Sequence, residues 1–166
     1  MATAANAAHL PPLGAHQREE VGHELQAIVV ELVDLSLLGK QLHWTVVGPL
    51  FRPLHRQLDE LVDSWRELAD TVAERAVAIG SFPDGQSATV SASSPLGSVK
   101  RGELEDRVVV RELTSRLAEA AERARSRMDR LGELDTASQD VVIEVVRAVE
   151  EQLWMIRSQF SEARGR

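Results

Sequence analysis

The spacing of apolar residues restricts this chain to helices over most of its length. Between residues 17 and 47, leucine, isoleucine and valine recur every three or four positions, which is the repeat of one helix face, and Gly48-Pro49 ends the segment. The same repeat occurs in residues 53–80, 104–131 and 136–156. No segment alternates as a strand would. These patterns predict an all-α fold with four long helices.

The connection between the second and third predicted helices is long. Residues 81–101 are rich in serine, proline and glycine, which favours an irregular segment with room for one short helix. The fourth helix is expected to open with a capping box formed by Thr136 and Gln139. Four helices with one long crossover between the second and third describe a four-helix bundle.

Composition narrows the class of protein. The 166 residues fit one domain, which we divide into a flexible N-terminal tail (1–16), the bundle (17–163) and a short C-terminal tail (164–166). No apolar run approaches the roughly 20 residues that span a bilayer, and the N-terminus does not resemble a signal peptide, so no membrane location is expected. The absence of cysteine excludes disulfides and thiolate metal sites and fits a cytoplasmic location.

Two histidines and three carboxylates are the candidate metal ligands. His43 and His55 flank the predicted turn, and Asp59, Asp70 and Glu74 follow on the second helix. Imidazole and carboxylate groups are suitable donors for ferrous iron. Asp59 and Asp70 are three helical turns apart on one stripe, which separates them by roughly 16 Å along the axis. One metal ion cannot contact both, so a single site made of these residues takes its two halves from different chains.

The same residues also have a structural interpretation. A stripe of acidic residues on a helix is usually solvated, and Arg56, Arg66 and Arg75 are close enough in sequence to pair with it. In this interpretation, His43 is a histidine at a helix end with its hydrogen bonds satisfied, and His55 lies on the surface. Taken one at a time, these structural interpretations are favoured. Taken together they are less satisfactory, because the two histidines flank one turn and precede an acidic stripe.

Other histidines give weaker patterns. Glu20 and His23 form one Glu-x-x-His motif, whereas a di-iron site inside a single bundle needs two such motifs. We therefore disfavour an intrachain di-iron enzyme. His9, His16 and His23 recur every seven residues, but prolines and a glycine between them rule out one continuous helix face. Coincidence is the preferred interpretation, and a second metal site at these histidines stays open.

The stretch from Asp34 to Phe51, DLSLLGKQLHWTVVGPLF, resembles the Dps family of DNA-protecting starvation proteins, or mini-ferritins, in its actinobacterial form. The match continues through His55 and Asp59 to Asp70 and the acidic residue Glu74. The resemblance implies a ferritin-like bundle that assembles into a hollow shell of twelve subunits. It further implies a ferroxidase that oxidises Fe²⁺, preferably with hydrogen peroxide, stores the ferric mineral and protects the cell from oxidative damage.

The resemblance also assigns roles to individual residues. It places His43, His55 and Asp59 of one chain, with Asp70 and Glu74 of its partner, at a di-iron ferroxidase site across a two-fold interface. This agrees with the separation derived above from helix geometry. Two-fold symmetry then gives each dimer two sites.

Two neighbours of His43 have alternative interpretations. Trp44 adjoins a candidate ligand, and it either serves as an oxidisable side chain that spares DNA and the mineral or simply packs against apolar residues. Lys40 lies one turn before His43 and either pairs with a ligand carboxylate or is an exposed lysine.

The resemblance implies an entry route for iron. Members of this family admit iron through acidic pores where three subunits meet, near the junction of the third and fourth helices. Asp129, Glu133, Asp135 and Asp140 lie there, and we take Asp129 and Asp140 as the predicted pore residues. A negative pore concentrates cations by focusing the field. The alternative is that these acids stabilise the N-terminus of the fourth helix.

The charge balance argues against DNA binding. The formal net charge is −7, and residues 1–16 contain no charged side chain, whereas phosphate is bound by lysine and arginine. At the other end, Arg157, Arg164 and Arg166 face only a few carboxylates. The alternative function is a nucleoid-associated DNA-binding protein with secondary iron chemistry. A metal-free helical assembly protein is less favoured, because the ligand set is intact.

Overall fold

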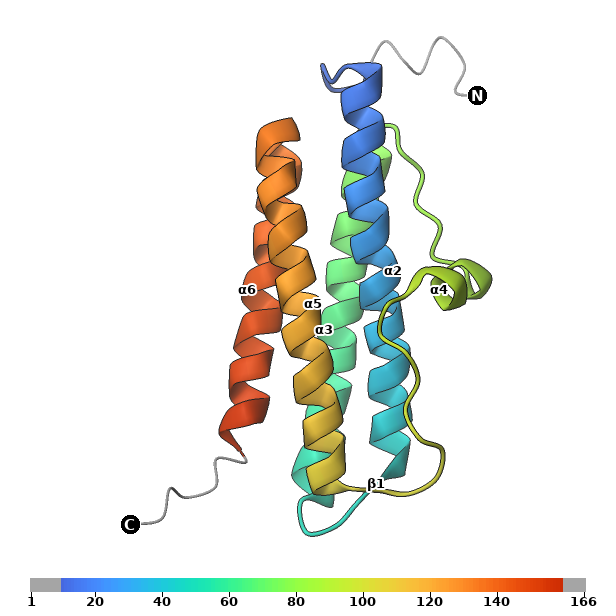
Figure 1. Cartoon of the computed structure of the whole chain (residues 1–166), viewed down its shortest axis with the longest axis vertical. Coiled ribbons are helices and arrows are strands. Elements are labelled where there is room, and N and C mark those ends of the chain that lie inside the picture. Colours follow the sequence, from blue (N-terminus) through green and yellow to red (C-terminus); the bar gives the residue numbers. More distant parts are fainter. Residues whose placement is uncertain (1–9, 160–166) are drawn as a thin grey trace.

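The computed structural model describes residues 10–159, and within them four long helices lie side by side (Figure 1). These are α2 (Ala15–Thr45), α3 (Phe51–Ala78), α5 (Asp106–Leu134) and α6 (Thr136–Ser158). A short helix, α4 (Ser87–Ser93), lies in the crossover from α3 to α5. The predicted bundle with a long second connection is therefore confirmed, as is the short helix within that connection.

The crossover determines the direction of the helices. Helices α2 and α3 are antiparallel neighbours, and so are α5 and α6 (Figure 1). Because the crossover returns along the side of α2, α3 and α5 run in the same direction. None of the helices in the described part of the chain is long and apolar enough to cross a membrane.

The expectation that the chain contains no strand is wrong in one place. β1 (Val46–Val47) and β2 (Leu104–Glu105) form a parallel pair in which Val46 lies opposite Leu104. Strands of two residues are too short to show an alternating pattern, which explains why the sequence does not indicate them. Their pairing joins the end of α2 to the start of α5.

The centre of the core is built around Trp65 of α3, which is fully buried. Its indole N–H donates to Oε1 of Gln152 on α6 at 2.8 Å, and the Gln152 amide donates to the Ser64 hydroxyl at 3.0 Å. Gly39 of α2 makes room for the ring, since a Cβ there would lie 2.7 Å from both Trp65 and Val62. A glycine inside a helix costs about 1 kcal/mol relative to alanine. This glycine therefore reflects the close approach of α2 to α3.

The start of α6 differs from the predicted capping box. Thr136 is the first residue of the helix, and Asp135 is its N-cap. The Asp135 carboxylate accepts the Ser138 N–H at 3.1 Å and the Ser138 hydroxyl at 2.5 Å. An ionised carboxylate is a stronger acceptor than a hydroxyl and also interacts favourably with the positive end of the helix dipole. Asp135 therefore caps the helix, one residue before the expected cap.

Candidate metal centre

The turn between α2 and α3 brings the two candidate histidines together. Gly48 has a φ of 121°, a conformation that favours glycine, and the Asp106 carboxylate accepts the Leu50 N–H at 2.8 Å. A Cβ at Gly48 would collide with that carboxylate at 2.7 Å. Beyond this turn α3 runs back along α2, so the His55 ring stacks on the His43 ring with centroids 3.6 Å apart.

Each histidine is oriented by the backbone of the other. His43 Nδ1 lies 2.7 Å from the His55 carbonyl oxygen, and His55 Nδ1 lies 3.0 Å from the His43 carbonyl oxygen. Because a carbonyl only accepts, each Nδ1 carries the proton and each Nε2 keeps its lone pair. A histidine that binds a metal usually donates its other ring N–H in this way. His43 is thus satisfied at one nitrogen, and its second nitrogen is the one suited to a metal.

Asp59 completes this cluster. Its Oδ1 lies 3.4 Å from His43 Nδ1, and the Lys40 ammonium bonds the same oxygen. The hydrogen bond from Lys40, together with the Lys40 charge, lowers the pKa of Asp59 and outweighs the opposing effect of burial. The carboxylate is therefore ionised at neutral pH. Of the two interpretations of Lys40, pairing with a candidate ligand is the one observed.

The other two candidate ligands lie elsewhere on α3. Asp70 and Glu74 are exposed and share one helix face, eleven and fifteen residues beyond Asp59. Within residues 10–159, no group of three or more histidine and acidic side chains is arranged to hold a metal ion. His43, His55 and Asp59 form one cluster, and the chain does not bring Asp70 and Glu74 to it.

One of the three arginines expected to pair with the acidic stripe, Arg75, has other partners. Arg75 donates to the Asp135 carboxylate at 2.6 Å and to the Ser138 hydroxyl at 2.9 Å, both beyond the α5–α6 turn. The acids of α3 at positions 63, 67, 70 and 74 are exposed, as the solvated interpretation expects. Sequence spacing suggested a local partner for Arg75, whereas its partners lie about sixty residues away.

Large apolar side chains are exposed on α2 and at the start of α3. Trp44 is 70% exposed, so little of its indole ring packs against its own chain. Leu37 and Phe51 are also exposed, and the Phe51 ring lies 4.9 Å from the His55 ring. Exposed apolar groups such as Trp44 and Phe51, on either side of the turn between α2 and α3, suit a surface for contact with another chain.

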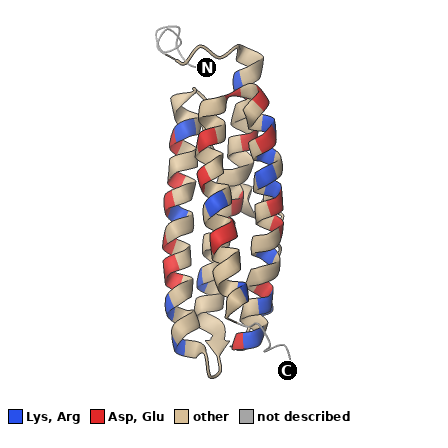
Figure 2. Cartoon of the chain, turned by 90° about the vertical axis from the view of Figure 1, so that its left-hand side faces the viewer, with Lys and Arg blue, Asp and Glu red and all other residues tan. Residues whose placement is uncertain are grey.

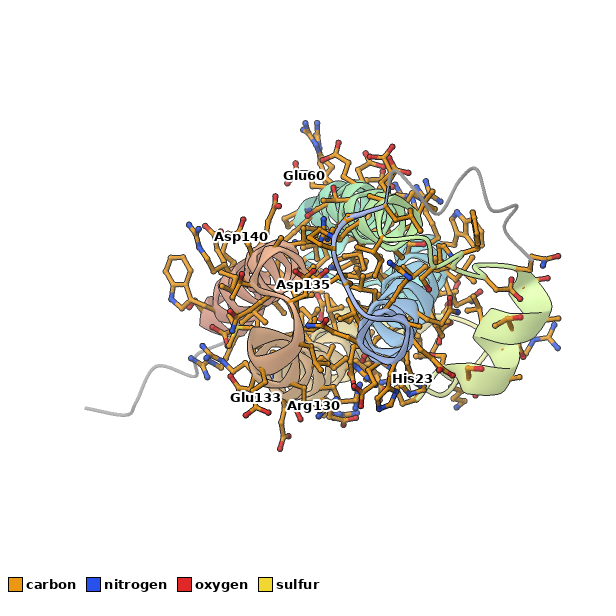
Figure 3. All side chains as sticks on the ribbon, turned by 90° about the horizontal axis from the view of Figure 1, so that it is seen from above. His23, Glu60, Arg130, Glu133, Asp135 and Asp140 are labelled. Carbon is orange, nitrogen blue, oxygen red and sulfur yellow. The ribbon has the colours of Figure 1, made fainter. Side chains whose placement is uncertain are left out.

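The acids at the α5–α6 junction divide into two kinds. Asp135 lies between the helices, where it holds Arg75, and it is therefore not available to a pore (Figure 3). Burial alone raises the pKa of Asp135, but hydrogen bonds from Ser138 and Arg75 lower it below its usual value. Glu133 and Asp140 lie at the periphery (Figure 3), and Asp129 is also exposed. A shallow hollow of about 760 Å³ runs along the outside of α6 beside Asp140.

The N-terminal histidines do not form a cluster in the described part of the chain. His16 and His23 are exposed, and His16 Nε2 lies 3.8 Å from the Glu20 carboxylate. His9 lies outside the described residues. A second metal site at these histidines therefore gains no support from His16 and His23.

The two buried acids of α2, Glu24 and Glu31, form ion pairs with arginines of α5. Glu24 accepts from Arg127 at 2.7 Å and from Arg130 at 2.8 Å, and Glu31 accepts from Arg123 at 2.9 Å. Acidic and basic residues are interspersed along the helices (Figure 2). The buried acids of α2 thus pair with arginine, which agrees with the argument against an intrachain di-iron site.

Comparison with known proteins gives a consistent result. A model of the ferritin-like domain matches residues 23–165. The protein called DNA protection during starvation protein 2 of Deinococcus radiodurans is 30% identical over 149 residues, which are 90% of this chain and 62% of the relative. This chain therefore spans less than two thirds of that relative's length.

A second relative and a solved structure cover more of their length. The DNA protection during starvation protein of Mycolicibacterium smegmatis is 30% identical over 158 residues, which are 94% of this chain and 85% of the relative. The tetragonal structure of Mycobacterium smegmatis Dps is similar with a TM-score of 0.89 and 28% identity, over 95% of this chain and 96% of that one.

Proposed function

Because the chain belongs to the Dps family of ferritin-like proteins, we propose that it is a ferroxidase and iron-storage protein. Its substrate is Fe²⁺, its preferred oxidant is hydrogen peroxide, and its product is a ferric mineral held inside a hollow shell of twelve copies. This activity protects the cell from oxidative damage, and we place the protein in the cytoplasm.

The cluster of His43, His55 and Asp59 is the observation that supports this function most strongly. It presents two imidazole Nε2 atoms and an ionised carboxylate at the edge of the bundle. Asp70 and Glu74 are the remaining donors. Along the same helix, Asp70 lies roughly 16 Å from Asp59, and Glu74 lies farther away. If two copies of α3 meet in opposite directions across a two-fold axis, each cluster faces the partner's acidic pair, and the dimer has two complete sites.

The donor set suits this chemistry. Imidazole and carboxylate hold iron while leaving positions for water or peroxide. Two ferrous ions each lose one electron, and the two electrons with two protons convert one hydrogen peroxide into two water molecules. No hydroxyl radical is released. We further propose that Trp44, which is exposed beside His43, is oxidised before DNA or mineral, and that Lys40 pairs with Asp59 before iron binds.

Ferrous titration of the iron-free, full-length particle tests the function. Fe²⁺ is added in steps with hydrogen peroxide or with oxygen, and the ferric absorbance and the peroxide consumed are recorded. We expect a fast, saturable phase that uses about one peroxide for every two Fe²⁺, followed by slower mineral growth. Oxidation no faster than that of free iron would refute the proposal.

We predict that iron enters through an acidic pore that includes Asp140. Because a negative pore raises the local concentration of cations, Asp140→Asn is expected to slow oxidation in whole particles about threefold to tenfold at low ionic strength. The effect shrinks as salt screens the attraction. Stopped-flow absorbance at several salt concentrations measures it.

Two variants serve as controls for the pore. Glu103→Gln removes an exposed acid in the crossover and is expected to leave the rate unchanged. Asp70→Asn is expected to reduce the iron bound at equilibrium at every salt concentration, whereas Asp140→Asn leaves bound iron intact. Equal rates for Asp140→Asn and the wild type across all salt concentrations would show that iron enters elsewhere.

The alternative function, DNA binding, has one observation in its favour, which is the name of the relatives. Against it stand the net charge of −7 and an N-terminal tail without charged side chains. We therefore predict little retention of plasmid DNA in a gel at about 0.15 M salt, without bridging metal. Tight retention would favour the alternative, and deletion of residues 157–166 should then remove most of it.

A further inference from the structure

Helix α3 is held to α6 by side-chain hydrogen bonds at three levels. At one end Gln159 donates to Gln57 Oε1 at 2.6 Å. In the middle Gln152 bridges the Trp65 indole and the Ser64 hydroxyl. At the other end Arg75 donates to both Asp135 and Ser138. The contacts therefore span nearly the whole of α3.

These contacts lie opposite the candidate ligands. Each residue of an α-helix is rotated by about 100° from the one before it. Relative to Asp59, this places Asp70 at about 20° on the same face. The residues of α3 at the back, roughly 140–160° from Asp59, are Gln57, Ser64 and Arg75. One face of α3 therefore binds α6 while the other carries the ligands outward.

The Arg75 contact is the one ion pair between these helices within residues 10–159. The side chains of Arg75 and Asp135 are 19% and 12% exposed. The lowered pKa of Asp135 keeps the pair charged. Because Asp135 also caps α6, Arg75 is anchored to a fixed helix start rather than to a mobile side chain. Removing one partner of such a pair leaves the other charge without compensation.

Arg75 also stands next to a candidate ligand. It directly follows Glu74, lies five residues after Asp70, and is in the last turn of α3, where helix ends fray. We infer that Arg75 is a positioning residue, whose contact with Asp135 and Ser138 fixes the rotation of the α3 end that carries Asp70 and Glu74. This inference rests on the proposed function, because it concerns the acidic half of the shared site.

Metal affinity in the full-length, iron-free particle tests the inference, with Co²⁺ as a redox-inert probe. The affinity is obtained from the visible absorbance of bound Co²⁺. Supporting groups around metal ligands typically contribute 10–100-fold in affinity, so Arg75→Met is expected to bind Co²⁺ about tenfold more weakly. Arg75→Lys, which keeps the charge, is expected to recover part of the loss. Ser138→Ala removes the hydroxyl that bonds Arg75 and Asp135 but keeps the Arg75–Asp135 ion pair, and a severalfold loss is expected.

Arg123→Met is the matched control. It also removes an arginine from a partly buried pair between helices, with Arg123 28% and Glu31 9% exposed, but the pair joins α2 to α5. Both variants should lose similar thermal stability, and only Arg75→Met should lose Co²⁺ affinity. Equal losses of affinity in the two variants, or wild-type affinity in Arg75→Met and Ser138→Ala, would overturn the inference and leave the proposed function standing. Absence of a Co²⁺ site in the wild type would overturn both.

Discussion

A particle in which His43 and His55 are both replaced by alanine is expected to lose ferrous binding at the proposed site and to oxidise iron at least about a hundredfold more slowly. Removal of a group that only supports a metal ligand already lowers metal affinity or activity 10–100-fold, and this change removes two ligands. Only Asp59 would remain of the cluster on α2 and α3. Stopped-flow ferric absorbance gives the rate, and equilibrium titration gives the bound Fe²⁺.

The control for this variant uses histidines outside the cluster. His16→Ala/His23→Ala removes two exposed imidazoles that contact none of the candidate ligands. Its oxidation rate should equal that of the wild type. If the His43→Ala/His55→Ala particle also oxidised iron at the wild-type rate, the histidine cluster would not be the ferroxidase site.

Trp65→Ala is expected to lower the free energy of unfolding by about 3–5 kcal/mol, the usual cost of deleting a large aromatic side chain from a core. The fully buried ring packs against Gly39, which has no side chain to fill the space. The change also removes the donor to Gln152 Oε1, which is left unpaired in the core. Denaturant unfolding at one fixed protein concentration measures the loss, because assembly makes stability depend on concentration.

Trp65→Phe separates packing from the hydrogen bond. It keeps most of the ring but removes the indole N–H, so the unpaired Gln152 oxygen should cost about 1–3 kcal/mol. A loss below about 1 kcal/mol for Trp65→Ala would mean that the ring does not occupy the centre of the bundle.

The four helices were predictable because each repeats its apolar spacing over six or more turns, which leaves little ambiguity about the period. Shorter features were not predictable. β1 and β2 have two residues each, and the cap of α6 depends on whether Thr136 or its neighbour Asp135 accepts the helix N–H groups. Gly39 did carry a signal, since a glycine inside a strong helix pattern suggests close packing, but its partner Trp65 could be found only in the structure.

The candidate site, too, was predictable from the sequence only in part. The chemical types of the ligands and the separation of Asp59 from Asp70 follow from sequence, because helix geometry converts residue number into distance. The orientation of His43 and His55 does not, because it depends on backbone carbonyl oxygens that every residue has. The partners of Arg75 were also hidden, since they lie on another helix.

The central claim is that the metal site is shared between two chains, and reassembly of two inactive variants tests it most directly. One variant is His43→Ala/His55→Ala and the other is Asp70→Ala/Glu74→Ala. A mixed dimer would have one site with all five ligands and one site that keeps only Asp59. Random mixing in equal amounts should therefore restore about one quarter of the wild-type ferroxidase sites. No recovery of iron oxidation, in particles shown by native mass measurement to contain both variants, would contradict a shared site.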